Sequence, residues 1–362
     1  MINRYLATAF IVLAAFKNLS AQNKIENLII ITSDGLRWQE VFKGLDVELA
    51  RSKRFNEGDS TSIFRKYYAA TASESRKKIF PFLWTEIAAN GQLYGNRIYG
   101  NKVDVANPYR ISYPGYNELF TGYADSTVNS NSHPDNANIN LLGFLQQQTG
   151  FQNKIAAYGA WETFNRILNE SKLGFPVIAA FDKSGGEKPN ANQSIINKML
   201  MDSYKPWGTA ECLDVFTHYA AFEHLKTQRP RVMYIAYGET DEWAHSAKYS
   251  SYLNAANQVD KWLKDMWDFI QSDVHYKDKT ALLLTVDHGR GEGDTWVSHG
   301  KSIQGSNEAW FAVIGPGIKA KGEQKKPMQV YLQQLAQTAA HLLSLTFKAE
   351  HPVAAKVEEV WK

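Results

Sequence analysis

The sequence predicts an α/β fold with a doubly wound, mostly parallel central sheet and helices on both faces of that sheet. Two observations carry this prediction. Short and almost uninterrupted apolar runs recur along the chain, which is typical of strands buried on both faces. Longer segments with apolar residues at helical spacing separate these runs, which is the alternation of a parallel α/β sheet.

Six apolar runs are predicted as strands, and four amphipathic segments as helices. The strands are expected at 27–32, 154–158, 176–180, 231–237, 280–286 and 309–314. The helices are expected at 82–90, 207–226, 252–270 and 330–345. Three polar stretches are expected to be irregular, namely 51–76, 126–140 and 182–192. The sequence shows no internal repeat and no long linker.

The N-terminus has the pattern of a secretory signal. Met1–Arg4 is short and basic, Tyr5–Phe16 is apolar and uncharged, and the small residue Ala21 closes a cleavage motif. We therefore expect a signal peptide at 1–21, followed by a single catalytic domain with loop insertions at 22–362, exported to the periplasm or secreted. The apolar run spans about a dozen residues, short of the ~20 that a stable membrane anchor needs. The alternative is a short buried N-terminal helix.

The net charge and the single cysteine argue against some classes of binding partner and of metal site. Loss of 1–21 removes Arg4 and Lys17 and no acid, which lowers the formal net charge from +3 to +1. A nearly neutral protein has no global electrostatic basis for binding a nucleic-acid polymer. Cys212 is the only cysteine, so an internal disulfide and a cysteine-rich metal site are both excluded. The sequence does not indicate an oligomeric state.

Acidic residues follow three of the predicted strands. Asp34 follows the first strand, Asp241 follows the strand at 231–237, and Asp287 with His288 follows the strand at 280–286. Ligands of a doubly wound sheet bind beyond the carboxyl ends of its strands, so these side chains are expected to converge on one crevice. A single aspartate after a strand is often only a helix cap or turn residue, but three are harder to explain that way.

Two further histidines have partners in the sequence. Asp241 and His245 are four residues apart and share one face of a helical turn, if a helix begins here. Carboxylate and neutral imidazole together suit zinc or a similar divalent ion. His299 lies just before the last predicted strand. By contrast, His218 sits inside a predicted helix, where a structural role is the simpler interpretation.

The candidate nucleophile is Ser112. Pro114 and Gly115 fit a turn that opens a helix ending at Thr121-Gly122. Ser112 would then lie at a helix N-terminus, where backbone N–H groups favour a phosphate oxyanion. A metal ion on its hydroxyl would lower the pKa and make a general-base histidine unnecessary. The alternative is an ordinary capping serine.

The ordered set of motifs resembles the alkaline phosphatase superfamily, and most closely its nucleotide pyrophosphatase/phosphodiesterase branch. The matching segments cover most of the chain and are Ser33–Arg37, Ser112–Pro114 with Thr121–Gly122, Asp241–His245, Asp287–Gly289 and His299–Gly300. Each motif alone is modest, and the ordered set is specific.

The resemblance implies two divalent metal sites, usually zinc, although Asp and His would also accept manganese. The first site would use the Ser112 hydroxyl together with Asp34, Asp287 and His288. The second would use Asp241, His245 and His299. Two metal ions can clamp both sides of an in-line displacement, and Ser112 would form a covalent phosphoseryl intermediate.

The chain also departs from the branch. Members usually have a threonine nucleophile and, about twenty residues later, an asparagine that binds a phosphoryl oxygen. Asn131 is the nearest candidate for that asparagine, and Arg110 and Arg166 are candidate anion contacts, although surface arginines are the commoner case. Sulfatases that use formylglycine need an arginine where this chain has Tyr116, which argues against that chemistry.

The sequence therefore predicts an exported, metal-dependent phosphoric ester hydrolase, a phosphodiesterase or a phosphomonoesterase, that acts on a small-molecule phosphate ester. Two alternatives stay open. One is a sulfate or phosphonate ester hydrolase of the same superfamily. The other is a protein that binds metal and an anion without turnover.

Overall fold

A computed structural model describes residues 25–362, and the predicted signal peptide 1–21 lies outside them. Within the described part, no helix is both long and apolar enough to cross a bilayer. Export, and the division into 1–21 and one domain at 22–362, therefore stay predictions.

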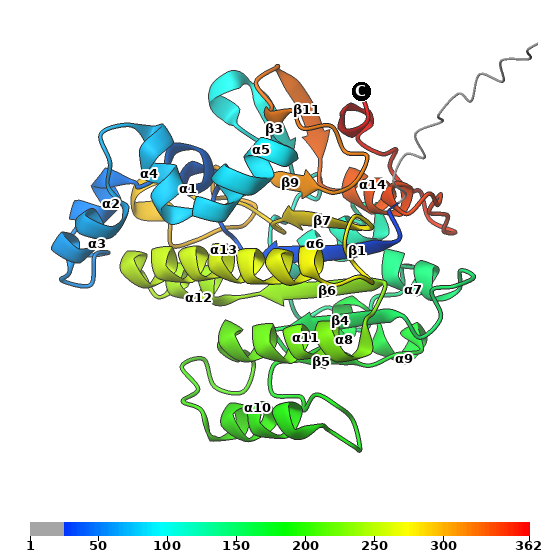
Figure 1. Cartoon of the computed structure of the whole chain (residues 1–362). Coiled ribbons are helices and arrows are strands. Elements are labelled where there is room, and N and C mark those ends of the chain that lie inside the picture. The colour runs from blue at the N-terminus through cyan, green and yellow to red at the C-terminus, as the bar shows by residue number, and fades with distance from the viewer. Residues whose placement is uncertain (1–24) are drawn as a thin grey trace, which may run out of the picture.

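The main sheet has eight strands and is mostly parallel (Figure 1). Its spatial order is β10 (Gly322–Glu323), β2 (Gln92–Tyr94), β9 (Phe311–Ile314), β7 (Thr280–Thr285), β1 (Asn27–Ser33), β6 (Val232–Tyr237), β4 (Ile155–Gly159) and β5 (Val177–Ala179). The strands from β7 to β5 are parallel, and β9 runs antiparallel to its neighbours β2 and β7. A smaller sheet has the order β11 (Met328–Tyr331), β3 (Asn101–Asp104) and β8 (Glu308–Ala309).

Helices connect the strands. The α-helices are α1 (Trp38–Lys43), α2 (Val47–Arg51), α3 (Ser60–Tyr67), α4 (Ala72–Ile79), α5 (Ala88–Asn90), α6 (Ser112–Thr121), α7 (Leu141–Gln146), α8 (Phe164–Ile167), α9 (Glu170–Leu173), α10 (Ala191–Asp202), α11 (Asp214–Gln228), α12 (Glu239–His245), α13 (Tyr249–Ser272) and α14 (Gln334–Leu342). A π-helical turn, η1 (Leu83–Ile87), precedes α5, and 3₁₀ turns lie at η2 (Arg97–Tyr99), η3 (Gly293–Thr295) and η4 (Glu358–Val360).

Both faces of the sheet are covered, as two tyrosines of β6 demonstrate. Tyr234 packs its ring against Phe120 of α6, with ring centroids 4.5 Å apart. Tyr237 is three residues further along the strand and therefore points to the opposite face. There it contacts Trp262 of α13 at 5.4 Å and bonds to His218 of α11. The predicted doubly wound α/β fold is confirmed.

The register between the central strands determines where their carboxyl ends lie. In β1 every residue is buried, because neighbouring strands pair with it on both sides. Thr32 lies opposite Thr285 of β7, and Ser33 lies opposite Tyr237 of β6. The carboxyl ends of three adjacent parallel strands are therefore level, and the segments that follow them begin at one place.

Three sequence expectations are corrected by the structure. The closing helix was expected at 330–345, but Val330 belongs to β11 and α14 spans only Gln334–Leu342. The segment expected to be irregular at 51–76 contains α3 and most of α4, whose N-termini are capped by Asp59 and Thr71. The helix expected at 207–226 begins only at Asp214, because the preceding residues pair with the chain after β4.

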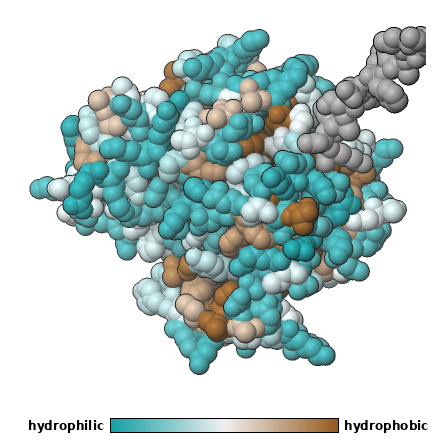
Figure 2. Space-filling model, viewed as in Figure 1, coloured by the Kyte–Doolittle hydropathy of each residue, from teal (hydrophilic) through white to brown (hydrophobic). Residues whose placement is uncertain are grey.

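Most of the molecular surface in Figure 2 is polar, with smaller apolar areas. Several exposed apolar side chains lie on or next to α10, which projects from the lower end of the view in Figure 1. They are Ile195, Met199, Met201 and Tyr204.

The buried histidine on α11 has a measurable consequence for stability. His218 stacks on Trp262 at 4.6 Å, and its Nδ1 lies 2.9 Å from the Tyr237 hydroxyl. Burial lowers the pKa of His218 to about 3, whereas an unfolded histidine titrates near ~6.5. The stability that the neutral ring contributes is therefore complete above pH ~6.5 and is lost as pH falls toward 3.

For His218→Gln we expect a free energy of unfolding that falls less steeply below pH 6.5 than that of the unmutated protein. The difference in slope is at most about 1.4 kcal/mol per pH unit. Urea unfolding at pH 7, 6, 5 and 4 would measure it. Parallel stability curves for the two proteins would show that His218 does not titrate in this way.

Candidate active site

The structure brings the three strand-end aspartates together. Asp34 follows β1, Asp287 lies two residues after β7, and Asp241 lies in α12 directly after β6. The three strands are neighbours in the order β7-β1-β6. All three aspartates are buried residues at this edge of the sheet. This is the crevice expected for a doubly wound sheet.

His288 is the centre of the first predicted ligand set. Its Nδ1 lies 3.0 Å from the carbonyl of Gly289, so Nδ1–H donates there and the lone pair of Nε2 is free. Three oxygens surround Nε2, and each lies 3.3 Å away. They are Ser112 Oγ, Asp34 Oδ1 and Asp287 Oδ2.

This arrangement fits a divalent cation. Asp34 Oδ1 and Asp287 Oδ2 are buried and have no hydrogen-bond partner within residues 25–362. An imidazole lone pair facing two carboxylate oxygens is repulsive unless a cation or proton lies between them. Ligand atoms about 2.0–2.1 Å from zinc at tetrahedral corners lie roughly 3.3 Å apart. The three distances from His288 Nε2 match that spacing.

The ionisation of this set supports the same interpretation. Burial, followed by the nearby charges of Asp287 and Asp241, holds the pKa of Asp34 well above its usual range. Burial and the charge of Asp241 do the same for the pKa of Asp287. Carboxyl groups with such raised pKa values become stable carboxylates only when positive charge compensates them.

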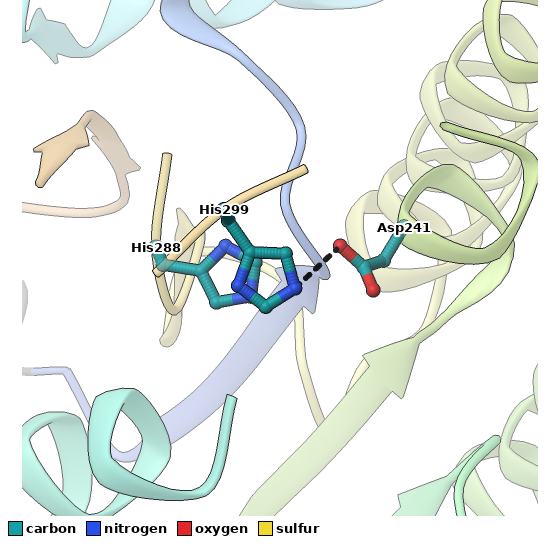
Figure 3. A group of neighbouring side chains, drawn as sticks. All are labelled: Asp241, His288 and His299. Carbon is teal, nitrogen blue, oxygen red and sulfur yellow. Dashed lines mark ion pairs between the residues drawn. The ribbon is translucent and has the colours of Figure 1, made fainter. Parts of the chain in front are cut away.

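The second predicted set lies beside the first. His245 Nε2 lies 3.0 Å from Asp241 Oδ2 and 3.0 Å from His299 Nε2. Nδ1–H of His299 donates to the carbonyl of Arg110 at 3.2 Å, which turns Nε2 toward the aspartate. Figure 3 shows His299 pointing at Asp241, with 3.7 Å between Nε2 and Oδ1.

The two sets are contiguous. The rings of His288 and His299 stack with centroids 3.8 Å apart, as Figure 3 shows. Ligand atoms of Asp241, His288 and His299 all lie within 4.8 Å of one another, as do those of Asp34, Asp287 and His288. Burial lowers the pKa of His299 to about 4 and holds the pKa of His288 well below its usual range. Both imidazoles are therefore neutral at pH 7, as metal ligation requires.

Arg290 is a buried cation that the sequence reasoning missed. Its guanidinium forms an ion pair with Asp241 and donates to the carbonyls of Trp296 (2.9 Å) and Val297 (2.7 Å). Burial opposes ionisation of Asp241, but the charges of Arg290 and His245 hold its pKa well below the usual range. The available signal was position alone, because Arg290 directly follows the motif at 287–289.

Ser112 occupies the predicted place at the start of a helix. It is the first residue of α6 and is 5% exposed, and α6 ends at Gly122, which has a left-handed conformation. Gly115 lies against the backbone after β7, where a Cβ atom would lie 2.3 Å from the carbonyl oxygen of Asp287. The absence of a side chain at Gly115 thus lets the first turn of α6 approach the metal ligands.

We expect Gly115→Ala to displace Ser112 from the ligand set. The clash is with backbone, so α6 must move, at a cost of about 1–3 kcal/mol in the free energy of unfolding. Turnover should fall by roughly tenfold or more, because small misplacements of reacting groups are costly. Gly143→Ala is the matched control, since its Cβ would meet only side chains, those of Leu173 at 3.4 Å and Asn140 at 3.7 Å. Equal Tm and turnover for the two variants would contradict this account.

Of the three predicted substrate contacts, only Asn131 lines the cavity. Asn131 lines the cavity beside Ser112, and its Oδ1 accepts the Tyr113 N–H at 3.0 Å. Arg110 contributes its carbonyl to His299, and its side chain does not line the cavity. Arg166 bonds to the carbonyl of His133 and to Thr163 Oγ1 (3.1 Å), also away from the cavity. The geometry thus favours Asn131 over both arginines.

The cavity has a volume of about 150 Å³. Its lining combines the metal-ligand candidates with aromatic and acidic side chains: Asp34, Ser112, Tyr116, Asn131, Trp161, Phe164, Glu211, Tyr237, Gly238, Asp241, Glu242, His245 and His299. Loop 126–140 and the segment after β4 contribute to it, whereas no residue of 51–76 does. Glu211 and Glu242 were not identified from sequence, because Glu211 belongs to no motif and Glu242 is not one of the ligand positions of the motif at 241–245.

Comparison with known proteins identifies the fold. No family profile and no curated sequence matches the chain. Among solved structures, the alkaline phosphatase PafA matches with a TM-score of 0.60 at 10% identity, covering 94% of this chain and 99% of that one. The phosphonate monoester hydrolase of Agrobacterium radiobacter matches with a TM-score of 0.59 at 13% identity (93% and 77% covered). A 2-O GAG sulfatase matches with a TM-score of 0.58 at 14% identity (93% and 74% covered).

These structures share the fold of the alkaline phosphatase superfamily, and the chain has this fold. The structural neighbours are hydrolases that act on different esters.

Proposed function

We propose that the protein is an exported, metal-dependent hydrolase of small phosphate esters, with Ser112 as its nucleophile. The observation that carries the proposal is the placement of Ser112 Oγ. It completes a set with His288, Asp34 and Asp287 in which both carboxylates have an unpartnered oxygen. A serine that merely capped a helix would not need this environment.

The residues suggest a division of roles. Asp34, Asp287, His288 and Ser112 would hold one divalent ion, and Asp241, His245 and His299 a second. Zinc suits both sets, since all ligands are nitrogen or oxygen. When bound, the ions would lower the pKa of the Ser112 hydroxyl and compensate charge on the substrate.

The proposed reaction is a double displacement at phosphorus. Ser112 Oγ attacks phosphorus in line, the bond from phosphorus to the ester oxygen breaks, and the alcohol leaves with the proton that the Ser112 hydroxyl gives up. Water then attacks the phosphoseryl group, which releases phosphate and restores the Ser112 hydroxyl. Asn131, fixed by its bond to the Tyr113 N–H, is positioned to contact a phosphoryl oxygen.

Tyr116 favours phosphate chemistry over formylglycine-dependent sulfate chemistry. It stands where such sulfatases need arginine, and its hydroxyl donates to Asp34 Oδ2 at 3.0 Å. This bond fixes the second oxygen of Asp34 and leaves the first one facing His288.

The test is metal analysis of the purified protein combined with a panel of nitrophenyl esters. We expect about two zinc ions per chain and turnover of a nitrophenyl phosphate monoester or diester well above that of sulfate and phosphonate esters. Faster turnover of nitrophenyl sulfate or a phosphonate ester would replace the proposal with the corresponding hydrolase. No turnover of any ester by the metal-loaded protein would leave only metal and anion binding.

A further inference from the structure

The cavity that contains Ser112 is also lined by a fixed acidic residue, Glu211. The chain around it pairs with the segment after β4. Trp161 and Glu211 form an isolated antiparallel bridge, and Cys212 N–H donates to the Ala160 carbonyl at 3.0 Å. Glu162 N–H donates to the Ala210 carbonyl at 2.8 Å. Glu211 is therefore held by backbone on both sides and cannot swing freely into solvent.

The Glu211 carboxyl group is buried, and within residues 25–362 one of its two oxygens has no hydrogen-bond partner. Its residue is 6% exposed, and Oε1 has no hydrogen-bond partner in the described part of the chain. The nearby charged groups are acidic, with Glu242 the most influential. Burial first, and then the charge of Glu242, hold the pKa of Glu211 well above its usual range. A group of this kind is costly to bury unless a ligand supplies a donor or a positive charge.

The backbone is shaped to admit this carboxyl group. At Gly238, directly after β6, a Cβ atom would lie 1.7 Å from Glu211 Oε1. Only glycine lets Glu211 approach so closely, and the approach places its carboxyl group in the lining of the same cavity as Ser112. The unpartnered oxygen is thus part of the built site.

Glu211 and Glu242 lie outside both predicted metal-ligand sets. Divalent ions held by Asp34, Asp241 and Asp287 would compensate those aspartates, and Arg290 is already paired with Asp241. Within residues 25–362, no basic side chain forms an ion pair with Glu211. The metal ions would therefore leave Glu211 and Glu242 without a cation of their own in this wall of the cavity.

The volume of the cavity and the residues that line it limit which substrate groups can bind there. The cavity of about 150 Å³ corresponds to roughly five water volumes, so it admits a phosphate group and a short substituent. Aromatic side chains of Trp161 and Phe164 line it beside the acids. Ammonium groups bind favourably both to carboxylates and to aromatic faces. A neutral hydroxyl would offer one hydrogen bond and no charge.

We propose that Glu211 and Glu242 bind a primary ammonium group on the alcohol portion of the substrate, so that the preferred substrates are phosphate esters of small amino alcohols. This inference rests on the proposed phosphate ester hydrolysis at Ser112 and adds the class of alcohol. Glu211 is a specificity-determining residue in this account.

The experiment compares two esters that differ by one ammonium group, 2-aminoethyl phosphate and ethyl phosphate. We expect the unmutated, metal-loaded protein to prefer the aminoethyl ester in kcat/KM by about tenfold or more. Glu211→Gln keeps the shape and removes the charge, and the preference should shrink by about tenfold. Glu162→Gln is the matched control, because Glu162 is exposed, lies on the same segment and does not line the cavity. It should keep the preference unchanged.

Two results would overturn the inference while leaving the proposed function intact. One is turnover of nitrophenyl phosphate without any preference for the aminoethyl ester. The other is an unchanged preference in Glu211→Gln together with loss of one bound metal ion per chain, which would assign Glu211 to a metal site. Failure to hydrolyse nitrophenyl phosphate would instead overturn the proposed function and this inference with it.

Discussion

Replacing Ser112 with alanine is expected to lower turnover of phosphate esters by on the order of 10³-fold or more. The hydroxyl would be the group that forms and breaks the bond to phosphorus, and no neighbouring side chain in the described structure offers a second nucleophile at the same place. Metal content should stay close to that of the unmutated protein, because two carboxylates and an imidazole remain in that set. Turnover and metal analysis of the same preparation measure both.

The combination of lost turnover and retained metal separates a nucleophile from a structural serine. If Ser112 only capped α6, alanine would lower Tm and leave kcat nearly unchanged. Ser132→Ala is a suitable control, since Ser132 is exposed in the loop that carries Asn131. Full turnover by Ser112→Ala would remove the nucleophile assignment and with it the phosphoseryl step.

Replacing Asp287 with asparagine is expected to remove about one metal ion per chain and to lower turnover by on the order of 10³-fold or more. Asp287 is completely buried, and its Oδ1 accepts the Gly35 N–H at 3.2 Å, a bond that an amide oxygen can keep. The remaining amide nitrogen would donate to His288 Nε2. Because the neutral amide would donate a hydrogen bond to the imidazole, this pair of side chains would no longer need a cation between them.

Stability without metal gives a second measure of this variant. In the metal-free protein Asp287 is a buried acid whose pKa is raised by burial and by the charge of Asp241. Asp287→Asn removes that cost, so after chelation the variant should be more stable than the unmutated protein by about 1 kcal/mol or more at pH 7. Asp294→Asn, at a side chain that is 82% exposed, is the control. Unchanged metal content in Asp287→Asn would show that this carboxylate is not a ligand.

Elements buried on both faces were predictable from the sequence, and marginal ones were not. The central residues of β1, β6 and β7 are apolar and every residue of these strands is buried, since neighbours and helices surround them. β11 pairs only within the three-stranded sheet and has two exposed residues among its four, so its pattern does not separate it from the helix that follows. Likewise α3 and α4 are short and polar, and their caps were not recognised as helix starts.

The candidate site divides in a similar way. The ligand types and their order could be recognised in the chain, because Asp34, Asp241 and Asp287 each follow a strand and bring local motifs with them. Arg290 and Glu211 belong to no motif, and Glu242 is not a ligand position of the motif that contains it. Their importance arises only from contacts across the fold, such as the ion pair from Arg290 to Asp241 and the approach of Glu211 to Gly238.

The sequence by itself determined the α/β alternation, the residues offered as metal ligands and the serine at a helix start, since each depends on residue types within a few positions. Only the tertiary structure decided that these ligands meet and that Nε2 of His288 faces three oxygens at one distance. The physical reason is that strand order and register, set by packing between distant segments, bring three chain-distant strand ends to one edge. The same packing buries Glu211 without a partner and so points to the chemistry of the substrate.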